Sequence, residues 1–313
     1  MTDPDENVSR RDLLRSVALG AAALMLPGGL EACKTGKSQE MQAGADPDLE
    51  RLTDWTRTLQ AEKLAGRDAR LGRSAIRVGE LAAGTPYQPY TLEAYLKSGG
   101  SPLREPLTLS LTRFDCVTLV ESCIAVARLA GVEGTPQWEG FGREIERMRY
   151  RGGDRRGYAS RLHYFSEWIS DGEKRGLVKD VGAELGGAED ARPLRFMTEH
   201  RASYPGLASD DVFREIGAVE RRISRQPRRV IPTKRIPEVV SRIETGDVLA
   251  FATEIPGLDV THTALAYRDE NEVLRVLHAP LSGGVVEITR ATLPEYVAAI
   301  RRSTGILVAR PEG

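Results

Sequence analysis

Apolar residues recur every three or four positions along much of the chain, and the pattern becomes strand-like towards its end. The helical period runs through residues 49–59, 72–83 and 117–129, and the last of these stretches contains no Gly or Pro. This spacing predicts helices with one or more buried faces. The later pattern predicts strands at residues 247–253, 261–268, 272–279 and 284–289.

Cys116 stands where the helix of residues 117–129 would begin, directly after Asp115, which is suited to cap that helix. A thiol in the first turn faces unpaired backbone N–H groups and the positive end of the helix dipole, which favours the thiolate. Cys116 is therefore a candidate nucleophile, and the alternative is a small buried core residue. Cys123 lies a rise of roughly 10.5 Å further along the same helix. Because a disulfide needs a shorter separation, we expect no bridge and assign Cys123 to the core.

Two of the four histidines fall on the predicted hairpin. If residues 269–271 form its turn, Arg268 faces Glu272 and His262 faces His278. Residues directly opposite one another have Cβ atoms about 4.5–5.5 Å apart, so both imidazoles would share one face of the sheet. The alanines that follow His262 on that face leave room for a helix to pack. A buried core histidine is the alternative for each residue taken separately.

Residues 158–169 combine several aromatic side chains with one arginine and one histidine. Arg161, His163 and Trp168 are therefore candidate substrate-binding residues on a wall that faces a sugar or a peptide. Packing in the core explains the aromatic residues equally well.

Charge excludes one class of partner. The chain has 313 residues, with 44 Lys and Arg against 45 Asp and Glu, which gives a net charge of -1. This balance gives no electrostatic reason to expect a nucleic-acid partner. The 28% of charged and 41% of hydrophobic residues are typical of an ordinary soluble globular protein.

The first 33 residues have the pattern of an export signal. Arg10 and Arg11 resemble a twin-arginine motif, and residues 16–30 form an apolar region that is short for a membrane span. Cys33 follows in a sequence that resembles a lipobox, although Glu31 is unusual there, so cleavage without lipidation is the alternative. Polar residues 34–48 would then tether the domain of residues 49–313. We expect an exported bacterial protein that is periplasmic or anchored to the membrane as a lipoprotein.

Three short motifs resemble those of the NlpC-type cell-wall cysteine hydrolases, which have a papain-like fold. These are GTPY at residues 84–87, DC at residues 115–116, and GD at residues 246–247 followed by THT at residues 261–263. The residues after Cys116 are Val-Thr-Leu, where those enzymes carry Ser-Gly, and this departure indicates a sister group.

That sister group is the N-acetylmuramoyl-L-alanine amidase-like family, which the chain resembles over residues 75–310. The similar segments are FDCVTLVE, RLHYFSEW, FMTEHRASYPGL and GLDVTHTALAYR followed by LHAPLSGGVVEI. The resemblance implies an α+β fold in which the Cys116 helix packs on an antiparallel sheet, with a helical N-terminal part and residues 135–210 inserted as a mostly helical lobe.

The resemblance also implies a cysteine hydrolase that cleaves the amide between muramic acid and L-alanine in peptidoglycan fragments, without a cofactor. His262 would take the proton of Cys116, and His278 would orient His262. The Cys116 backbone N–H, with the help of Tyr87, would bind the oxyanion. Asp115 is expected to cap the helix and not to act as an acid. Asp259 is a rival for the orienting role, but its position in the strand would place it on the opposite face.

Three alternatives remain at this stage. A zinc amidase would need His and carboxylate or Cys ligands at metal spacing, and the chain has neither HExxH nor CxxC. A cysteine endopeptidase would cut the γ-D-glutamyl–diaminopimelate bond instead. A lipoprotein that binds the cell wall without catalysis is the third, and the presence of Cys116, His262 and His278 disfavours it.

Overall fold

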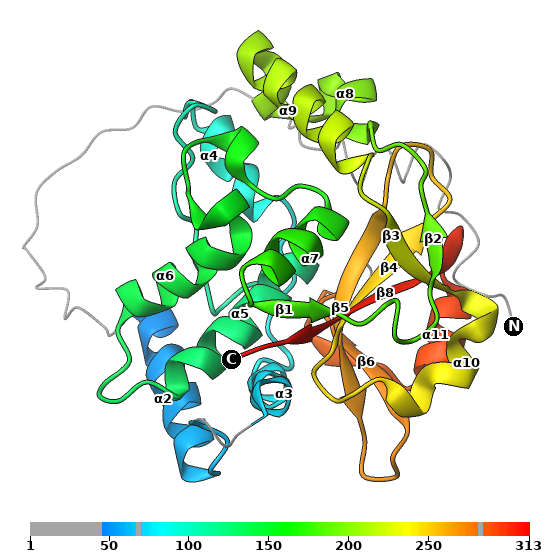
Figure 1. Cartoon of the computed structure of the whole chain (residues 1–313). Coiled ribbons are helices and arrows are strands. Elements are labelled where there is room, and N and C mark those ends of the chain that lie inside the picture. The colour runs from blue at the N-terminus through cyan, green and yellow to red at the C-terminus, as the bar shows by residue number, and fades with distance from the viewer. Residues whose placement is uncertain (1–45, 67–69, 281–283) are drawn as a thin grey trace, which may run out of the picture.

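The computed structural model describes residues 46–66, 70–280 and 284–313, in which helices lie on both sides of a central sheet (Figure 1). The predicted signal of residues 1–33, Cys33 included, and most of the predicted tether lie outside the described residues. Residues 47 and 48 of that tether already belong to the first described helix. Within the described part of the chain, no helix is long and apolar enough to cross a membrane.

Most helices of the described chain lie in its first two thirds, and two short ones follow. They are α2 (Pro47–Ala61), α3 (Leu71–Leu81), α4 (Ala94–Lys97), α5 (Cys116–Ala130), α6 (Trp138–Arg149), α7 (Phe165–Lys174), α8 (Phe196–Glu199), α9 (Asp210–Ile223), α10 (Ile236–Val239) and α11 (Leu293–Ala299). The predicted helices at residues 49–59, 72–83 and 117–129 correspond to α2, α3 and α5.

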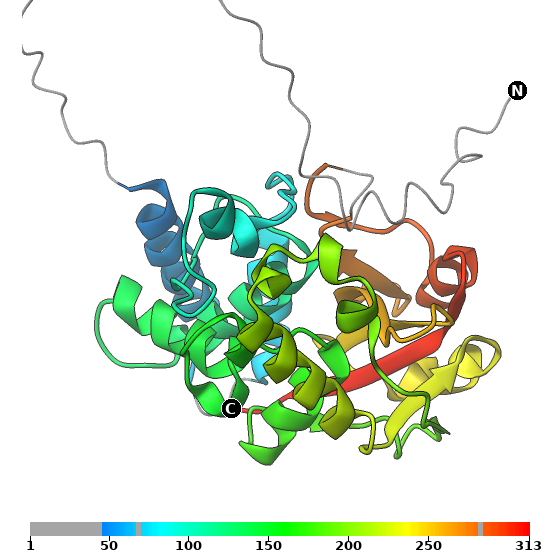
Figure 2. The ribbon, with the colours of Figure 1, turned by 90° about the horizontal axis from the view of Figure 1, so that it is seen from above.

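Strands of the described chain form one antiparallel sheet in the order β2-β3-β8-β4-β5-β6-β7, with β1 also paired to β8. Their bounds are β1 (Val178–Asp180), β2 (Ala188–Asp190), β3 (Arg228–Pro232), β4 (Val248–Thr253), β5 (Val260–Arg268), β6 (Leu274–His278), β7 (Glu287–Ile288) and β8 (Ser303–Pro311). The sheet confirms that β4, β5 and β6 are neighbours, as predicted. The long strand β8 lies between β3 and β4 in the sheet, and its C-terminal end lies beside the helices (Figure 2).

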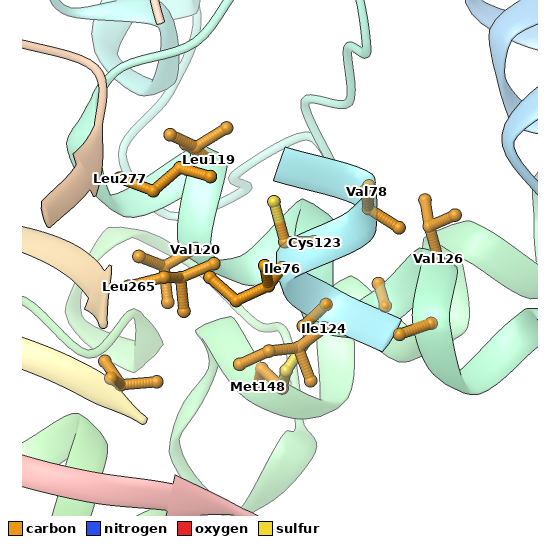
Figure 3. Packing of buried hydrophobic residues seen from close by; sticks show 14 of the residues in the cluster. Ile76, Val78, Leu119, Val120, Cys123, Ile124, Val126, Met148, Leu265 and Leu277 are labelled. Carbon is orange, nitrogen blue, oxygen red and sulfur yellow. The ribbon is translucent and has the colours of Figure 1, made fainter. Parts of the chain in front are cut away.

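Helix α5 is central because almost every side chain along it is buried. Leu119 and Val120 lie beside Leu277 and Leu265 of the sheet (Figure 3). The same core contains side chains of α2, α3, α6 and α7. The structure thus confirms the α+β class and the predicted packing of this helix on an antiparallel sheet.

The opposite face of the sheet carries a second core. Alternate residues Ala264 and Ala266 of β5 contribute to it, together with Leu293 and Val297 of α11. The helix that packs over the small residues following His262 is therefore α11, and α5 lies on the other face.

The predicted hairpin register is wrong by two residues. Arg268 pairs with Leu274 and not with Glu272, because Asp269 still bonds to Val273 and the turn begins one residue later than predicted. Glu272 closes this turn in the left-handed conformation, with φ 61°. A shift of two residues keeps each side chain on the same face of the sheet, so the two histidines remain neighbours.

Residues 135–210 do not form a separate helical lobe. Within this stretch β1 pairs with β8 and β2 pairs with β3, so two of its segments extend the main sheet. Side chains of α6 and α7 belong to the same core as α5. A third small core contains Tyr158 and Tyr164 from the middle of the stretch together with side chains of α8, and α9 contributes to it as well. The predicted helical content is present, but it is integrated into the domain.

Candidate active site

Cys116 is the first residue of α5, and the residue before it caps the helix. The Asp115 carboxylate accepts hydrogen bonds from the backbone N–H groups of Val117 (3.0 Å) and Thr118 (2.8 Å). Thr118 Oγ1 accepts in return from the Asp115 backbone N–H (2.8 Å), which completes a capping box. The prediction that Asp115 is the helix cap is confirmed.

The Cys116 thiol is protonated at rest, contrary to the expectation of a favoured thiolate. Burial and, to a smaller extent, the adjacent Asp115 carboxylate raise its pKa to about 11, although contacts from Thr263 and Val117 act in the opposite direction. The physical reason is that burial disfavours the charged thiolate, and the Asp115 carboxylate adds a negative charge next to the sulfur. The helix start therefore positions the thiol without ionising it.

Replacing Asp115 with asparagine is expected to lower the pKa of Cys116, because the amide keeps the cap and removes the charge. Alkylation by iodoacetamide follows the thiolate fraction, which for the wild type grows with pH up to about 11. The variant should therefore react faster at every pH below that value. Mass spectrometry of the alkylated Cys116 peptide measures the rate, and equal rates in the two proteins would contradict the explanation.

His262 and His278 form a directly bonded pair, with 2.8 Å between His262 Nε2 and His278 Nδ1. Burial, together with the neighbouring His278, lowers the pKa of His262 to about 3, and burial lowers the pKa of His278 to about 4. Both rings are therefore neutral at pH 7. The predicted proximity of the two imidazoles is confirmed, although they are diagonal neighbours and not directly opposite.

Alternation along β5 points His262 and its neighbour Thr263 to different faces. His262 stacks on Phe251, which belongs to the core between the sheet and α11. Thr263, in contrast, contacts the Cys116 thiol and lowers its pKa. The strand is irregular here, because β4 pairs with His262 and then with Val260, which leaves one extra residue as a bulge. Among the hydrogen bonds of the described residues, none joins Cys116 Sγ to His262. Proton transfer between them stays a prediction.

Tyr87 lies next to Cys116, as the GTPY motif suggested. Backbone bonds fix the motif between two segments: Tyr87 N donates to Gly284 O (2.8 Å), and Phe114 N donates to Pro86 O (3.1 Å). Burial raises the pKa of Tyr87, and the proximity of Cys116 raises it further. Tyr87 is thus a neutral hydroxyl that can donate a hydrogen bond, and its role towards an oxyanion stays a prediction.

Comparison with protein families gives a match to the model described as N-acetylmuramoyl-L-alanine amidase-like, over residues 77–306. The chain belongs to this family. No protein of curated function matches the chain.

Several solved structures are similar to this amidase-like chain, and their names differ. An N-acetylmuramoyl-L-alanine amidase from Bacteroides uniformis is 27% identical, with a TM-score of 0.70, and the match covers 78% of this chain and 99% of that one. A putative xylanase from Bacteroides fragilis is 31% identical, with a TM-score of 0.68 and coverage of 74% and 99%. LPG0564 from Legionella pneumophila, at 18% identity with a TM-score of 0.60 and coverage of 84% and 94%, shares the fold.

Three residues of the amidase-like chain that were predicted to bind substrate have structural partners instead. Trp168 is 3% exposed in the core and stacks on Phe165. Arg161 is buried and forms ion pairs with Glu93 (2.6 Å) and Glu105 (3.1 Å). The prediction of a substrate-facing wall is wrong for these two side chains, because buried partners occupy them.

His163 also has a partner within the protein, since its Nε2 lies 2.8 Å from the Tyr158 carbonyl oxygen. Burial lowers the pKa of His163 well below its ordinary value. Asp259 accepts a hydrogen bond from the Ser166 backbone N–H (2.8 Å) and so holds the start of α7. Neither residue is among the contacts of His262.

Sequence reasoning missed residues that surround the histidine pair. Tyr296 of α11 places its hydroxyl 3.3 Å from His278 Nδ1, and Glu287 of β7 places a carboxylate oxygen 3.6 Å from His278 Nε2. A signal for α11 exists in the sequence, because Thr292 and Glu295 have the spacing of a capping box. Nothing in the sequence indicated that this helix would cover the histidines.

A cavity of about 700 Å³ lies at the far end of β5, beside Arg268 and Asp247. Carboxylates already pair with several of its arginines, including Arg310 with Asp247 (2.8 Å). No group of three or more His, Cys, Asp or Glu side chains is arranged to hold a metal ion in the described part of the chain.

Proposed function

We propose that this protein is a cysteine-dependent amidase that cleaves the bond between N-acetylmuramic acid and L-alanine in peptidoglycan fragments, in cell-wall turnover or recycling. The observation that carries the proposal is the arrangement around a partly exposed thiol at the start of α5. This thiol contacts Thr263, the residue next to His262 in β5, and His262 is bonded to His278 as a neutral pair. The chain is also a member of the amidase-like family. Cysteine with a neighbouring imidazole is a common arrangement for acyl transfer.

The resting protonation states define how this site would work. A thiol and a neutral imidazole require His262 to accept the Cys116 proton as the sulfur attacks the amide carbon, without a preformed ion pair. The resulting oxyanion would be met by the Cys116 backbone N–H and the Tyr87 hydroxyl. The C–N bond then breaks as the His262 proton passes to the leaving amine of L-alanine. Water hydrolyses the thioester in the same way, and the thiol is regenerated.

The reaction products test the proposal directly. Purified residues 35–313 with a defined muropeptide should release the intact stem peptide and the free muramic sugar, identified by mass spectrometry. Activity should survive EDTA and be lost after iodoacetamide treatment. Cleavage after D-glutamate would instead support the γ-D-glutamyl–diaminopimelate endopeptidase alternative. Release of sugars from xylan, in line with the name of the Bacteroides fragilis structure, would contradict amidase function, as would binding without any cleavage.

We also propose that the protein is exported and acts in the periplasm or at the membrane, on the basis of the sequence motifs of its first 33 residues. Replacing both Arg10 and Arg11 with lysine should hold unprocessed precursor in the cytoplasm, which fractionation and immunoblotting would detect. Cys33→Ala should abolish incorporation of a fatty-acid label if that cysteine is lipidated. Normal export of the double-lysine variant would contradict the twin-arginine interpretation.

A further inference from the structure

The ring of His278 has a contact at each nitrogen, and the two contacts differ in kind. His278 is 2% exposed, so bulk solvent does not reach its ring. Nδ1 faces both His262 Nε2 (2.8 Å) and the Tyr296 hydroxyl (3.3 Å). Nε2 has no hydrogen-bond partner within the described residues, and the nearest charged group is the Glu287 carboxylate at 3.6 Å.

A neutral imidazole carries one N–H and one lone pair, so the bonded pair has two possible proton arrangements. In the first, His262 donates from Nε2 to the lone pair on His278 Nδ1, and the His278 proton is on Nε2. In the second, His278 donates from Nδ1 to His262 Nε2, and the His262 proton is on Nδ1. Only the first leaves His262 with a lone pair on Nδ1, the nitrogen that makes no hydrogen bond with the described residues.

The surroundings of His278 distinguish these arrangements. In the first, the His278 Nε2–H points towards the Glu287 carboxylate. In the second, a buried lone pair on Nε2 faces that negative charge. The Tyr296 hydroxyl fits both arrangements, because it can donate to a lone pair on Nδ1 or accept from an N–H there. Donor facing carboxylate is favourable, and a lone pair facing carboxylate is not.

Position in the fold places both residues beside the ring, with the Glu287 side chain 49% exposed at the edge of the sheet. Glu287 pairs directly with His278 in the β6–β7 ladder, so its side chain leaves the sheet beside the imidazole. Tyr296 packs its ring on Phe251 and on His278, with centroid separations of 5.4 and 5.2 Å. Two further elements, β7 and α11, therefore act on one ring.

We propose that Glu287 is a positioning residue that holds His278 as its Nε2–H tautomer and thereby keeps a lone pair on His262 Nδ1. The consequence for catalysis rests on the proposed function, because Nδ1 is then the atom that accepts the Cys116 proton. The tautomers themselves do not depend on it. Glu287 does not touch the reacting atoms in this proposal, since it acts through His278.

Nitrogen NMR of ¹⁵N-histidine-labelled residues 35–313 at pH 7 reads the tautomers directly, with signals assigned from His262→Asn and His278→Asn variants. The wild type should show Nε2–H on both rings. In Glu287→Gln the amide can also donate to a lone pair on Nε2, so signals of the Nδ1–H tautomer should appear. The kcat of this variant should fall about fivefold to tenfold, in proportion to the competent fraction, with little change in KM.

Matched controls are Glu270→Gln, on the exposed hairpin turn, and Tyr267→Phe, at the far end of β5, both of which should leave tautomers and kcat unchanged.

An Nδ1–H proton on either wild-type ring would overturn the proposal, and so would a Glu287→Gln variant with unchanged tautomers. If Cys116→Ala remains active while the tautomers behave as stated, the proposed function fails and the positioning inference stands. If Cys116→Ala is inactive and the wild-type rings are Nδ1–H, the reverse holds.

Discussion

Cys116→Ala is expected to reduce muropeptide amide hydrolysis to background, whereas Cys123→Ala should keep most of the activity. The two cysteines lie on the same helix, but their surroundings differ: Cys116 is partly exposed at its start, and Cys123 is fully buried among apolar side chains. Removing a nucleophile typically costs on the order of 10⁴-fold or more in kcat. Initial rates of stem-peptide release, measured by mass spectrometry, compare the two variants with the wild type.

The same pair of variants controls for loss of folding. Burial raises the pKa of Cys123 beyond that of Cys116, so iodoacetamide should label one site in the folded wild type and none in Cys116→Ala. Thermal unfolding followed by circular dichroism should give similar midpoints for Cys116→Ala and the wild type, because the Cys116 side chain is only partly buried. A folded Cys116→Ala protein that retains a tenth of the wild-type rate would remove this cysteine from the mechanism.

Local periodicity was enough to predict the elements that carry the candidate site. Helix α5 and strands β4 to β6 have their expected positions, because each combines a clear pattern with turn residues at its ends. Strand β8 received no assignment, although it lies between β3 and β4 in the sheet. Its residues 306–309 are all buried, so the strand has no alternation of polar and apolar residues to reveal it.

The histidine pair shows how a correct site can follow from an inexact register. Side chains alternate with a period of two, so an error of two residues left His262 and His278 on one face. The actual register depends on the left-handed conformation of Glu272. Glutamate rarely adopts this conformation, so the sequence did not predict it.

Burial, in contrast, could not be inferred from residue type. Arg161 was assigned to a substrate wall because it stands beside a histidine among the aromatic residues of 158–169. In the fold it reaches Glu93, a residue 68 positions earlier in the chain, and that carboxylate and Glu105 neutralise it inside the protein. The ionisation of Cys116 was misjudged for a related reason, since the effect of Asp115 and of burial exceeded that of the helix dipole.

Glu121→Ala is expected to destabilise the protein by about 3–5 kcal/mol, the usual cost of leaving one partner of a buried ion pair without its counter-charge. Glu121 accepts a 2.8 Å hydrogen bond from Arg149 Nε, and their side chains are 1% and 4% exposed. Arg149 also donates to the Thr108 carbonyl oxygen (2.6 Å). The pair therefore joins α5 to α6 and to the segment that leads into the helix cap before Cys116.

Two comparisons in urea unfolding isolate the buried charge as the cause. Glu121→Leu combined with Arg149→Met removes both charges and should lose less stability than Glu121→Ala alone, because no ion is left unpaired in the core. Arg147→Ala breaks an exposed pair with Glu144 on the same helix α6 and should cost less than about 1 kcal/mol. If Glu121→Ala costs no more than Arg147→Ala, the buried pair does not hold α5 in place. If it costs the expected amount, any loss of activity in that variant at temperatures well below unfolding reports how firmly the start of α5 must be held for Cys116 to react.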